Sequence, residues 1–392
     1  MPRLLALAAG LGLALAARAQ PAPPAALDSL VVATMDEVGI VGVGAAVLVR
    51  GEVVWSGGYG FADVRRTRPF TPHTAMPVGS IAKTVTGVAM MRAVQEGRLS
   101  LDADVSAHLP FRVANPHHPD APITLRHLAT HTSGITDRWE VYRDAYRYGA
   151  DAPEPLGAFL AAYLVPGGAH YATANFLDAR PGTVRDYSNI GAALAGYVVE
   201  RAVGESLPAY TRRHVFEPLG MTHTGWSDAE IAPGALSTLF AAQDGVAIPI
   251  QPYTLTTYPD GALRTSVADL ARFFAALLGD GAYRDARILD AASTAEMTRF
   301  QFSDANRPVN FPAADGNSGL FWRTKFSGTR VGHGGNDPGL ATEMLADLTG
   351  EIGVILFVNT SLAGPDGRAV GVLFDAFWRH AEALHAAGPA ER

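Results

Sequence analysis

The sequence of 392 residues contains no cysteine, and only two of its 31 basic residues are lysines, Lys83 and Lys325. The absence of cysteine excludes disulfide bonds, a thiolate nucleophile and cysteine metal ligands. Charged residues are scarce at 18%, the net charge is −7, and no basic cluster is present, so we expect no nucleic-acid partner. The 48% of apolar residues suffice for a sizeable core, which excludes a disordered or fibrous chain.

The first 19 residues have the pattern of a secretory signal peptide. A basic residue, Arg3, precedes an apolar stretch at 4–16, and residues 17–19 form a small-x-small cleavage site. The apolar stretch is too short to span a bilayer comfortably. We therefore expect cleavage after Ala19 and a periplasmic or secreted protein without stable membrane insertion. An uncleaved N-terminal anchor is the alternative.

Strand patterns lie near both ends of the chain, and helical patterns lie between them. Alternating apolar residues around turns predict hairpins over residues 43–59 and 340–359. Apolar residues at helical spacing predict terminal helices at 25–38 and 368–387. Further helices are predicted at 80–96, 124–130, 189–202, 208–215, 267–278 and 291–300.

This order predicts an α+β fold in which one antiparallel sheet is built from the N- and C-terminal segments and is flanked by helices. The sheet domain would be discontinuous and comprise residues 25–78 and 305–387. A mainly helical region, residues 79–304, would be inserted between its two parts. We expect a ligand cleft where the two regions meet.

The segment at 78–83, Val-Gly-Ser-Ile-Ala-Lys, opens the helix predicted at 80–96. Ser80 and Lys83 are three residues apart and share a helix face, so the amine can reach the hydroxyl. A serine hydroxyl needs a base to become a nucleophile, and arginine cannot serve because it stays charged. Because the chain contains so little lysine, the presence of Lys83 at this position favours a role in proton transfer. In the alternative, Ser80 is a helix cap and Lys83 a surface residue.

Tyr187 and Asn189 directly precede another predicted helix. Tyr187 can act as a base if a neighbouring ammonium group lowers its pKa, and Asn189 offers an amide to a substrate carbonyl or to Lys83. Taken alone, Tyr-Ser-Asn is more typical of a turn before a helix, with Tyr187 packed on the core.

The segment at 331–339 is rich in glycine and leads into a predicted strand. It contains His333, Gly334, Gly335 and Asn336. Glycine beside a strand lets backbone approach a ligand and leaves N–H groups unscreened. A carbonyl oxygen that becomes an oxyanion needs two such donors. The alternative is a loose glycine-rich turn.

Together these segments resemble the serine β-lactamase and penicillin-binding-protein superfamily, specifically its class C β-lactamase-like branch of esterases, peptidases and transpeptidase relatives. The three motifs of the family occur in the family order, as Ser80–Lys83, Tyr187–Asn189 and His333–Gly335. Three further segments resemble that branch: 123–135, 216–221 and 260–263. The resemblance covers essentially the whole chain after residue 19.

The resemblance implies a function and a role for each motif. Ser80 would attack a carbonyl and form an acyl-enzyme, and Lys83 and Tyr187 would transfer its proton. The backbone N–H groups of Ser80 and Asn336 would form the oxyanion hole, while Asn189 would hold the substrate. Water activated on the Tyr187 side would then release the product. The expected partner is a small-molecule or peptide acyl substrate, and no cofactor is expected.

The third motif departs from the pattern of true β-lactamases, which usually carry Lys-Thr-Gly where this chain has His333, Gly334 and Gly335. The change removes a permanent cation and a hydroxyl that would hold a substrate carboxylate, and histidine is cationic only where its surroundings raise its pKa. We therefore expect an ester, amide or peptide substrate. A β-lactamase or D-Ala-D-Ala carboxypeptidase is one alternative, and a catalytically silent relative that binds peptides or cell-wall fragments is another.

Two other groups of residues invite a functional interpretation. His127 and His131 are four residues apart, but Leu128 stands where a zinc protease motif needs glutamate, so we expect no metal. An aromatic group follows, which either lines a substrate pocket or, as we favour, packs in the core: Trp139, Tyr142, Tyr146 and Tyr148.

Overall fold

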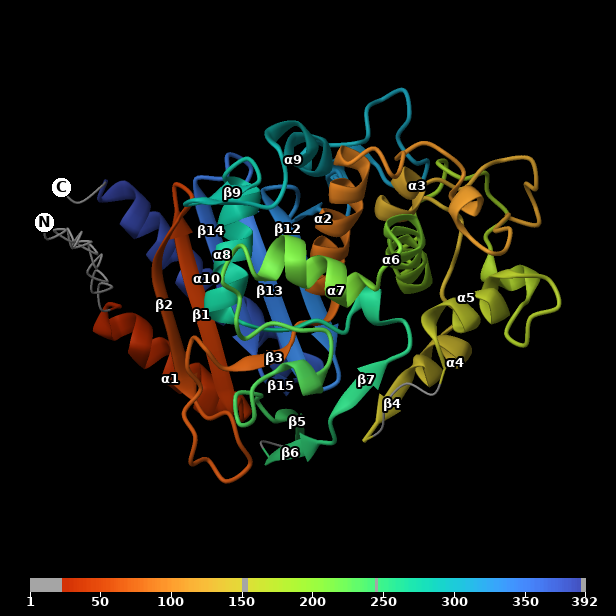
Figure 1. Ribbon diagram of the computed structural model, residues 1–392. Coiled ribbons are helices and arrows are strands. Elements are labelled where there is room, and N and C mark those ends of the chain that lie inside the picture. The colour runs from red at the N-terminus through yellow and green to blue at the C-terminus, as the bar shows by residue number, and fades with distance from the viewer. Residues whose placement is uncertain (1–22, 150–153, 244–245, 389–392) are drawn as a thin grey trace, which may run out of the picture.

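The central sheet joins the two ends of the chain. The computed structural model describes residues 23–149, 154–243 and 246–388, and the predicted signal peptide lies outside them. Six antiparallel strands pair in the order β11-β12-β13-β14-β1-β2. Their bounds are β1 Gly42–Val49, β2 Glu52–Gly60, β11 Arg323–Lys325, β12 Arg330–Asp337, β13 Leu340–Asp347 and β14 Ile352–Val358. The early strand β1 lies beside the late strand β14 (Figure 1), which confirms the predicted α+β fold.

Alternating residues of the central strand β1 face two different cores, as the two-residue period of a strand requires. Val43 and Val47 pack in a cluster with residues of α1 (Ala25–Val38) and α10 (Arg368–Ala386). Ala46 and Leu48 pack on the opposite face, in the cluster that contains α8 (Val267–Leu278) and α2 (Ala82–Gln95). Because β1 is covered on both faces, all eight of its residues are buried.

The inserted region packs around α2 and α6, which contact each other. Besides α2 and α8, the α-helices of this region are α3 Leu125–Ala129, α4 Trp139–Tyr142, α5 Leu156–Leu164, α6 Asn189–Val203, α7 Leu207–Thr211 and α9 Ala291–Thr298. The helix predicted at 208–215 begins as α7 and continues as a π-helical turn over Arg212–Phe216. Although α8 belongs to this region by sequence, it covers the sheet (Figure 1). Among the described residues, no helix has the length and apolar character needed to cross a membrane.

The remaining short strands form small sheets separate from the six-stranded sheet. Their bounds are β3 Ala75–Pro77, β4 Tyr146–Tyr148, β5 Leu239–Gln243, β6 Val246–Ile250, β7 Tyr253–Leu255, β8 Arg264–Ser266, β9 Ala282–Tyr283, β10 Ala286–Arg287 and β15 Thr360–Ser361. The antiparallel pair of β3 and β8 matters most for the site. Just beyond it, the Val78 N–H donates to the Leu263 carbonyl oxygen at 3.0 Å, which brings the segment before α2 beside residues 260–263.

Candidate active site

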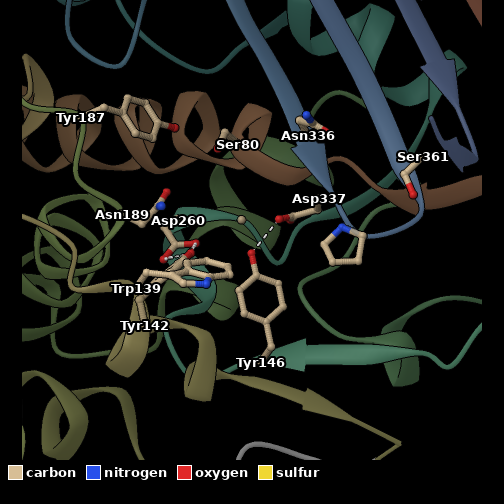
Figure 2. Close-up of a pocket in the computed structure, with 12 residues that line it drawn as sticks. Ser80, Trp139, Tyr142, Tyr146, Tyr187, Asn189, Asp260, Asn336, Asp337 and Ser361 are labelled. Atoms are coloured by element: carbon tan, nitrogen blue, oxygen red, sulfur yellow. Dashed lines mark hydrogen bonds between the residues drawn. The ribbon is translucent and has the colours of Figure 1, made fainter. Parts of the chain in front are cut away.

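Residues of the first two sequence motifs meet at one cavity with Asn336, which directly follows the third motif. The cavity has a volume of about 470 Å³ and lies where the end of β12 meets the inserted region. Figure 2 shows Ser80, Tyr187, Asn189 and Asn336 around it. His333, Gly334 and Gly335 lie further back along β12 and are not among the lining residues.

Ser80 lies in a 3₁₀ turn, Gly79–Ile81, that leads into α2. Its side chain caps neither the turn nor the helix, so the structure contradicts the interpretation of Ser80 as a helix cap. Val78, which precedes the turn, is held from two sides: its N–H donates to the Leu263 carbonyl oxygen at 3.0 Å, and its carbonyl oxygen accepts a hydrogen bond from Thr342 of β13 at 2.9 Å. Gly79 then adopts a positive φ of 54°, which glycine allows without strain. Ser80 is therefore presented to the cavity by a rigid backbone.

The Lys83 side chain is fully buried, with 0% exposure. Its Nζ donates hydrogen bonds to three acceptors: Ser80 Oγ at 3.0 Å, Asn189 Oδ1 at 2.7 Å and the Asp260 carbonyl oxygen at 2.7 Å. These contacts satisfy the donors of an ammonium group. The distance between Lys83 Nζ and Ser80 Oγ also permits direct proton transfer between the two side chains.

The Tyr187 ring lies over Lys83, with Nζ 5.0 Å from the ring centroid. The Tyr187 ring also packs against the His131 ring, with centroids 4.3 Å apart, and faces the His333 ring, with centroids 6.3 Å apart. Figure 2 shows its hydroxyl turned toward Ser80. The structure thus brings together the serine, lysine and tyrosine that the sequence singled out.

Asp137, which the sequence analysis did not single out, fixes the segment that carries Tyr187 and Asn189. Its carboxylate accepts hydrogen bonds from the backbone N–H groups of Asn189 and Ile190 at 2.7 and 3.0 Å, and from the Ser188 hydroxyl at 2.8 Å. Ser188 in turn caps α6. Burial raises the pKa of Asp137, although these three donors favour its ionised form. No local pattern marks this residue, because its partners lie 51 to 53 positions away.

The third motif is part of a strand rather than a segment before one. Gly332, His333, Gly334 and Gly335 all pair with β13 inside β12. A Cβ atom on Gly335 would overlap the Val78 carbonyl oxygen, so glycine is required here for close approach rather than for flexibility. A Cβ atom on Gly79 would lie 3.4 Å from the Asn336 nitrogen, which places that N–H beside the Ser80 turn.

His333 supplies no positive charge to the site. The side chain is 1% exposed, and Nδ1 lies 2.8 Å from the Gly334 carbonyl oxygen. Burial, reinforced by the positive charges of Arg323 and Lys83, holds the pKa of His333 well below its usual range. The imidazole is therefore neutral at physiological pH, so this position carries no cation.

Two carboxylates at the cavity were also missed as site residues. Burial raises the pKa of Asp260 to about 7 and that of Asp337 to about 6. Asp260 accepts a hydrogen bond from the Tyr142 hydroxyl at 3.1 Å, and Asp337 accepts one from the Tyr146 hydroxyl at 2.6 Å. Both tyrosines line the cavity together with Trp139, so these aromatic residues form a pocket wall as well as packing on one another.

The comparisons with known proteins agree with this site. A family model described as Beta-lactamase matches residues 27–373, so the chain belongs to this family. The resemblance to the β-lactamase and penicillin-binding-protein superfamily is thereby confirmed, and the chain is a β-lactamase-fold relative of serine hydrolases.

The individual relatives carry different descriptions. The putative penicillin-binding protein PbpX of Bacillus subtilis (strain 168) is 29% identical over 243 residues, which cover 61% of this chain and only 56% of PbpX. The octameric penicillin-binding protein homologue from Pyrococcus abyssi has a TM-score of 0.74 at 26% identity. The match covers 92% of this chain and 77% of the Pyrococcus chain. The D-amino acid amidase from Ochrobactrum anthropi SV3, solved with L-phenylalanine amide, has a TM-score of 0.70 at 22% identity. The match covers 93% of this chain and 100% of the amidase chain, which shows that the two share a fold.

Gly335→Ala tests the close approach of β12 to the Ser80 turn. The added methyl group must push the strand and the turn apart, so we expect a destabilisation of about 1–3 kcal/mol and a much slower reaction at Ser80. Urea unfolding and the rate of covalent labelling of Ser80 measure these effects. Gly371→Ala is the matched control, because an added Cβ on this α10 residue meets nothing within 4 Å; we expect stabilisation by roughly 0.5–1 kcal/mol and unchanged labelling.

Asp337→Asn tests the charge state of the buried carboxyl. The pKa of Asp337 rises from 3.8 to about 6 on folding, so the folded state binds the proton more tightly and the carboxyl contributes stability below pH 4 that is lost as the pH rises through 6. The stability of the wild type relative to the Asn variant should therefore decline from pH 4.5 to pH 8. Urea unfolding across this range measures it, and a constant or rising difference would contradict the assignment.

Proposed function

We propose that the protein is an exported serine hydrolase that cleaves an ester, amide or peptide bond through an acyl-enzyme on Ser80. The observation that carries the proposal is the fully buried Lys83, whose Nζ lies 3.0 Å from Ser80 Oγ beside a substrate-sized cavity. Membership of the Beta-lactamase family supports the same chemistry. The signal-like pattern of residues 1–19 supports export.

In the proposed reaction, Ser80 Oγ attacks the substrate carbonyl carbon while its proton passes to the unprotonated member of the Lys83–Tyr187 pair, either Lys83 as a neutral amine or Tyr187 as a phenolate. Lys83 is placed for direct transfer, and Tyr187 lies beside it to deliver the proton to the leaving group. The backbone N–H groups of Ser80 and Asn336 stabilise the oxyanion. Asn189 orients both Lys83 and the substrate, and water activated from the Tyr187 side then hydrolyses the ester to Ser80.

One observation favours the alternative of a β-lactamase or D-Ala-D-Ala carboxypeptidase. The Arg323 guanidinium lies 5.9 Å from the centroid of the Tyr187 ring, and its charge acts on the neighbouring His333. A guanidinium group at this end of the site can bind a substrate carboxylate, which would replace the cation that the third motif lacks. A silent relative that only binds peptides is disfavoured, because binding alone requires no buried lysine beside a serine.

The nucleophile is tested with a fluorophosphonate probe and peptide mapping. We expect an adduct on Ser80 and its loss in Ser80→Ala, with hydrolysis reduced by at least about 10³-fold. Lys83→Arg should reduce hydrolysis by about 10²-fold or more, because arginine cannot accept the proton. Lys325→Arg is the matched control, since an arginine there can still pair with Glu343, and it should keep its activity. A folded wild type without a Ser80 adduct would refute the proposal.

A panel of acyl donors distinguishes the substrate classes. The panel comprises a short-chain nitrophenyl ester, a D-Ala-D-Ala peptide and a chromogenic cephalosporin. Because His333 is neutral, we expect kcat/KM for the ester to exceed that for the cephalosporin by about 100-fold or more. The reverse order, lost again in Arg323→Gln, would instead establish the carboxylate-binding alternative.

A further inference from the structure

One wall of the cavity combines two carboxylates with three aromatic rings. We call it the acidic wall and define it as Trp139, Tyr142, Tyr146, Asp260 and Asp337, all of which line the same cavity as Ser80. The residues come from α4, β4, β12 and the 3₁₀ turn Tyr258–Asp260. Figure 2 shows them gathered below Ser80, with Asn189 between Asp260 and Tyr187.

The carboxylates of this wall lack a close ion pair among the described residues, although the charge of Lys83 acts on both of them and that of Arg264 on Asp337. In the part of the chain that the structure describes, the ion pairs include neither Asp260 nor Asp337. The tyrosine hydroxyls that donate to them are uncharged. The ammonium group of Lys83 contacts the backbone oxygen of Asp260 rather than its carboxylate. A buried carboxylate without a counter-ion is costly, so a cation that enters the cavity would relieve this cost.

One carboxylate oxygen is directed to the neighbourhood of the nucleophile. Asp337 Oδ1 accepts the hydrogen bond from Tyr146, whereas Oδ2 lies 3.4 Å from the position of a Cβ on Gly79 and 3.8 Å from that of a Cβ on Gly261. Gly79 directly precedes Ser80. A cation bound to Oδ2 would consequently sit within a few bonds of a carbonyl held at Ser80.

The aromatic rings of the wall also suit a cation. Trp139 is 63% exposed, and its ring centroid lies 6.1 Å from that of Tyr142. Tyr142 and Tyr146 meet edge to face, with centroids 5.8 Å apart and an interplanar angle of 89°. Ring faces attract ammonium groups, most strongly when water is excluded. Rings and carboxylates on one wall therefore select the same kind of ligand.

We propose that the acidic wall binds a positively charged amino group on the acyl part of the substrate, close to the scissile carbonyl. This inference rests on the proposed function. Tyr187, which would protonate the leaving group, lies at the other end of the site, so the acyl substituent faces the acidic wall. The substrate class is thus the amides, esters or peptides of amino acids whose amino group is free.

A pair of substrates that differ only in the amino group tests the proposal. Alanine p-nitroanilide, as each enantiomer, is compared at pH 8 with propionyl p-nitroanilide. We expect kcat/KM for at least one alanine enantiomer to exceed that for the propionyl substrate by ten-fold or more. Asp337→Asn should reduce this ratio at least ten-fold, whereas Asp36→Asn, which removes an exposed carboxylate from α1, should leave it unchanged. A ratio of one or less in the wild type would overturn the proposal.

A second measurement needs neither turnover nor a variant. Benzylammonium should slow the fluorophosphonate labelling of Ser80 in the wild type at concentrations at which benzyl alcohol, its uncharged counterpart, has no effect. Equal protection by both compounds would overturn the proposal for the acidic wall while leaving the Ser80 hydrolase intact. Failure of the probe to label Ser80 at all would instead refute the proposed function.

Discussion

The burial of Lys83 is the constraint on which the rest of the site depends. A lysine side chain without exposure is stable only when each of its donors has an acceptor, because desolvation of an ammonium group is costly. The three acceptors come from Ser80, from Asn189 at the start of α6, and from the backbone of Asp260. The contacts with Asn189 and Asp260 span 106 and 177 positions of the chain. Any displacement of α6 or of the turn at Asp260 would remove a hydrogen-bond acceptor from this buried side chain, so a single side chain holds the serine and two distant segments in one arrangement.

The surrounding structure keeps those segments in place. Asp137 accepts hydrogen bonds from the first N–H groups of α6. These bonds fix the start of the helix and with it the positions of the Asn189 amide and of Tyr187, which directly precedes this segment. On the opposite side, Gly335 allows β12 to lie directly against the turn before Ser80. The six-stranded sheet supplies the rigidity, since β12 is paired along its whole length with β13. The nucleophile, Lys83 and the Asn336 N–H are thus positioned by regular elements, and Tyr187 lies two residues before the start of α6.

The sequence predicted the features that depend on local patterns. The helix expected at 25–38 has the bounds of α1, because its apolar spacing is undisturbed and a glycine follows it in the left-handed conformation. In contrast, the strand character of His333 to Gly335 was not predicted, because three glycines within four residues conceal the pairing with β13. Asp137, Asp260 and Asp337 were missed as site residues because their partners lie far away in the chain. The Tyr142–Asp260 and Tyr146–Asp337 hydrogen bonds span 118 and 191 positions.

The charges of the site are arranged along its length. Arg323 lies at the Tyr187 end beside the neutral His333, and its guanidinium is a cation there that can bind a leaving group. Asp260 and Asp337 lie at the other end, among tyrosine rings. Because the carboxylates themselves are buried, water screens their charge weakly, and such a gradient acts on a substrate before any contact with Ser80 is complete. A substrate with an amino group on its acyl side would enter in one orientation only. That orientation turns its leaving group toward Tyr187, so under the proposed mechanism the same charges that select the substrate also align it for proton transfer.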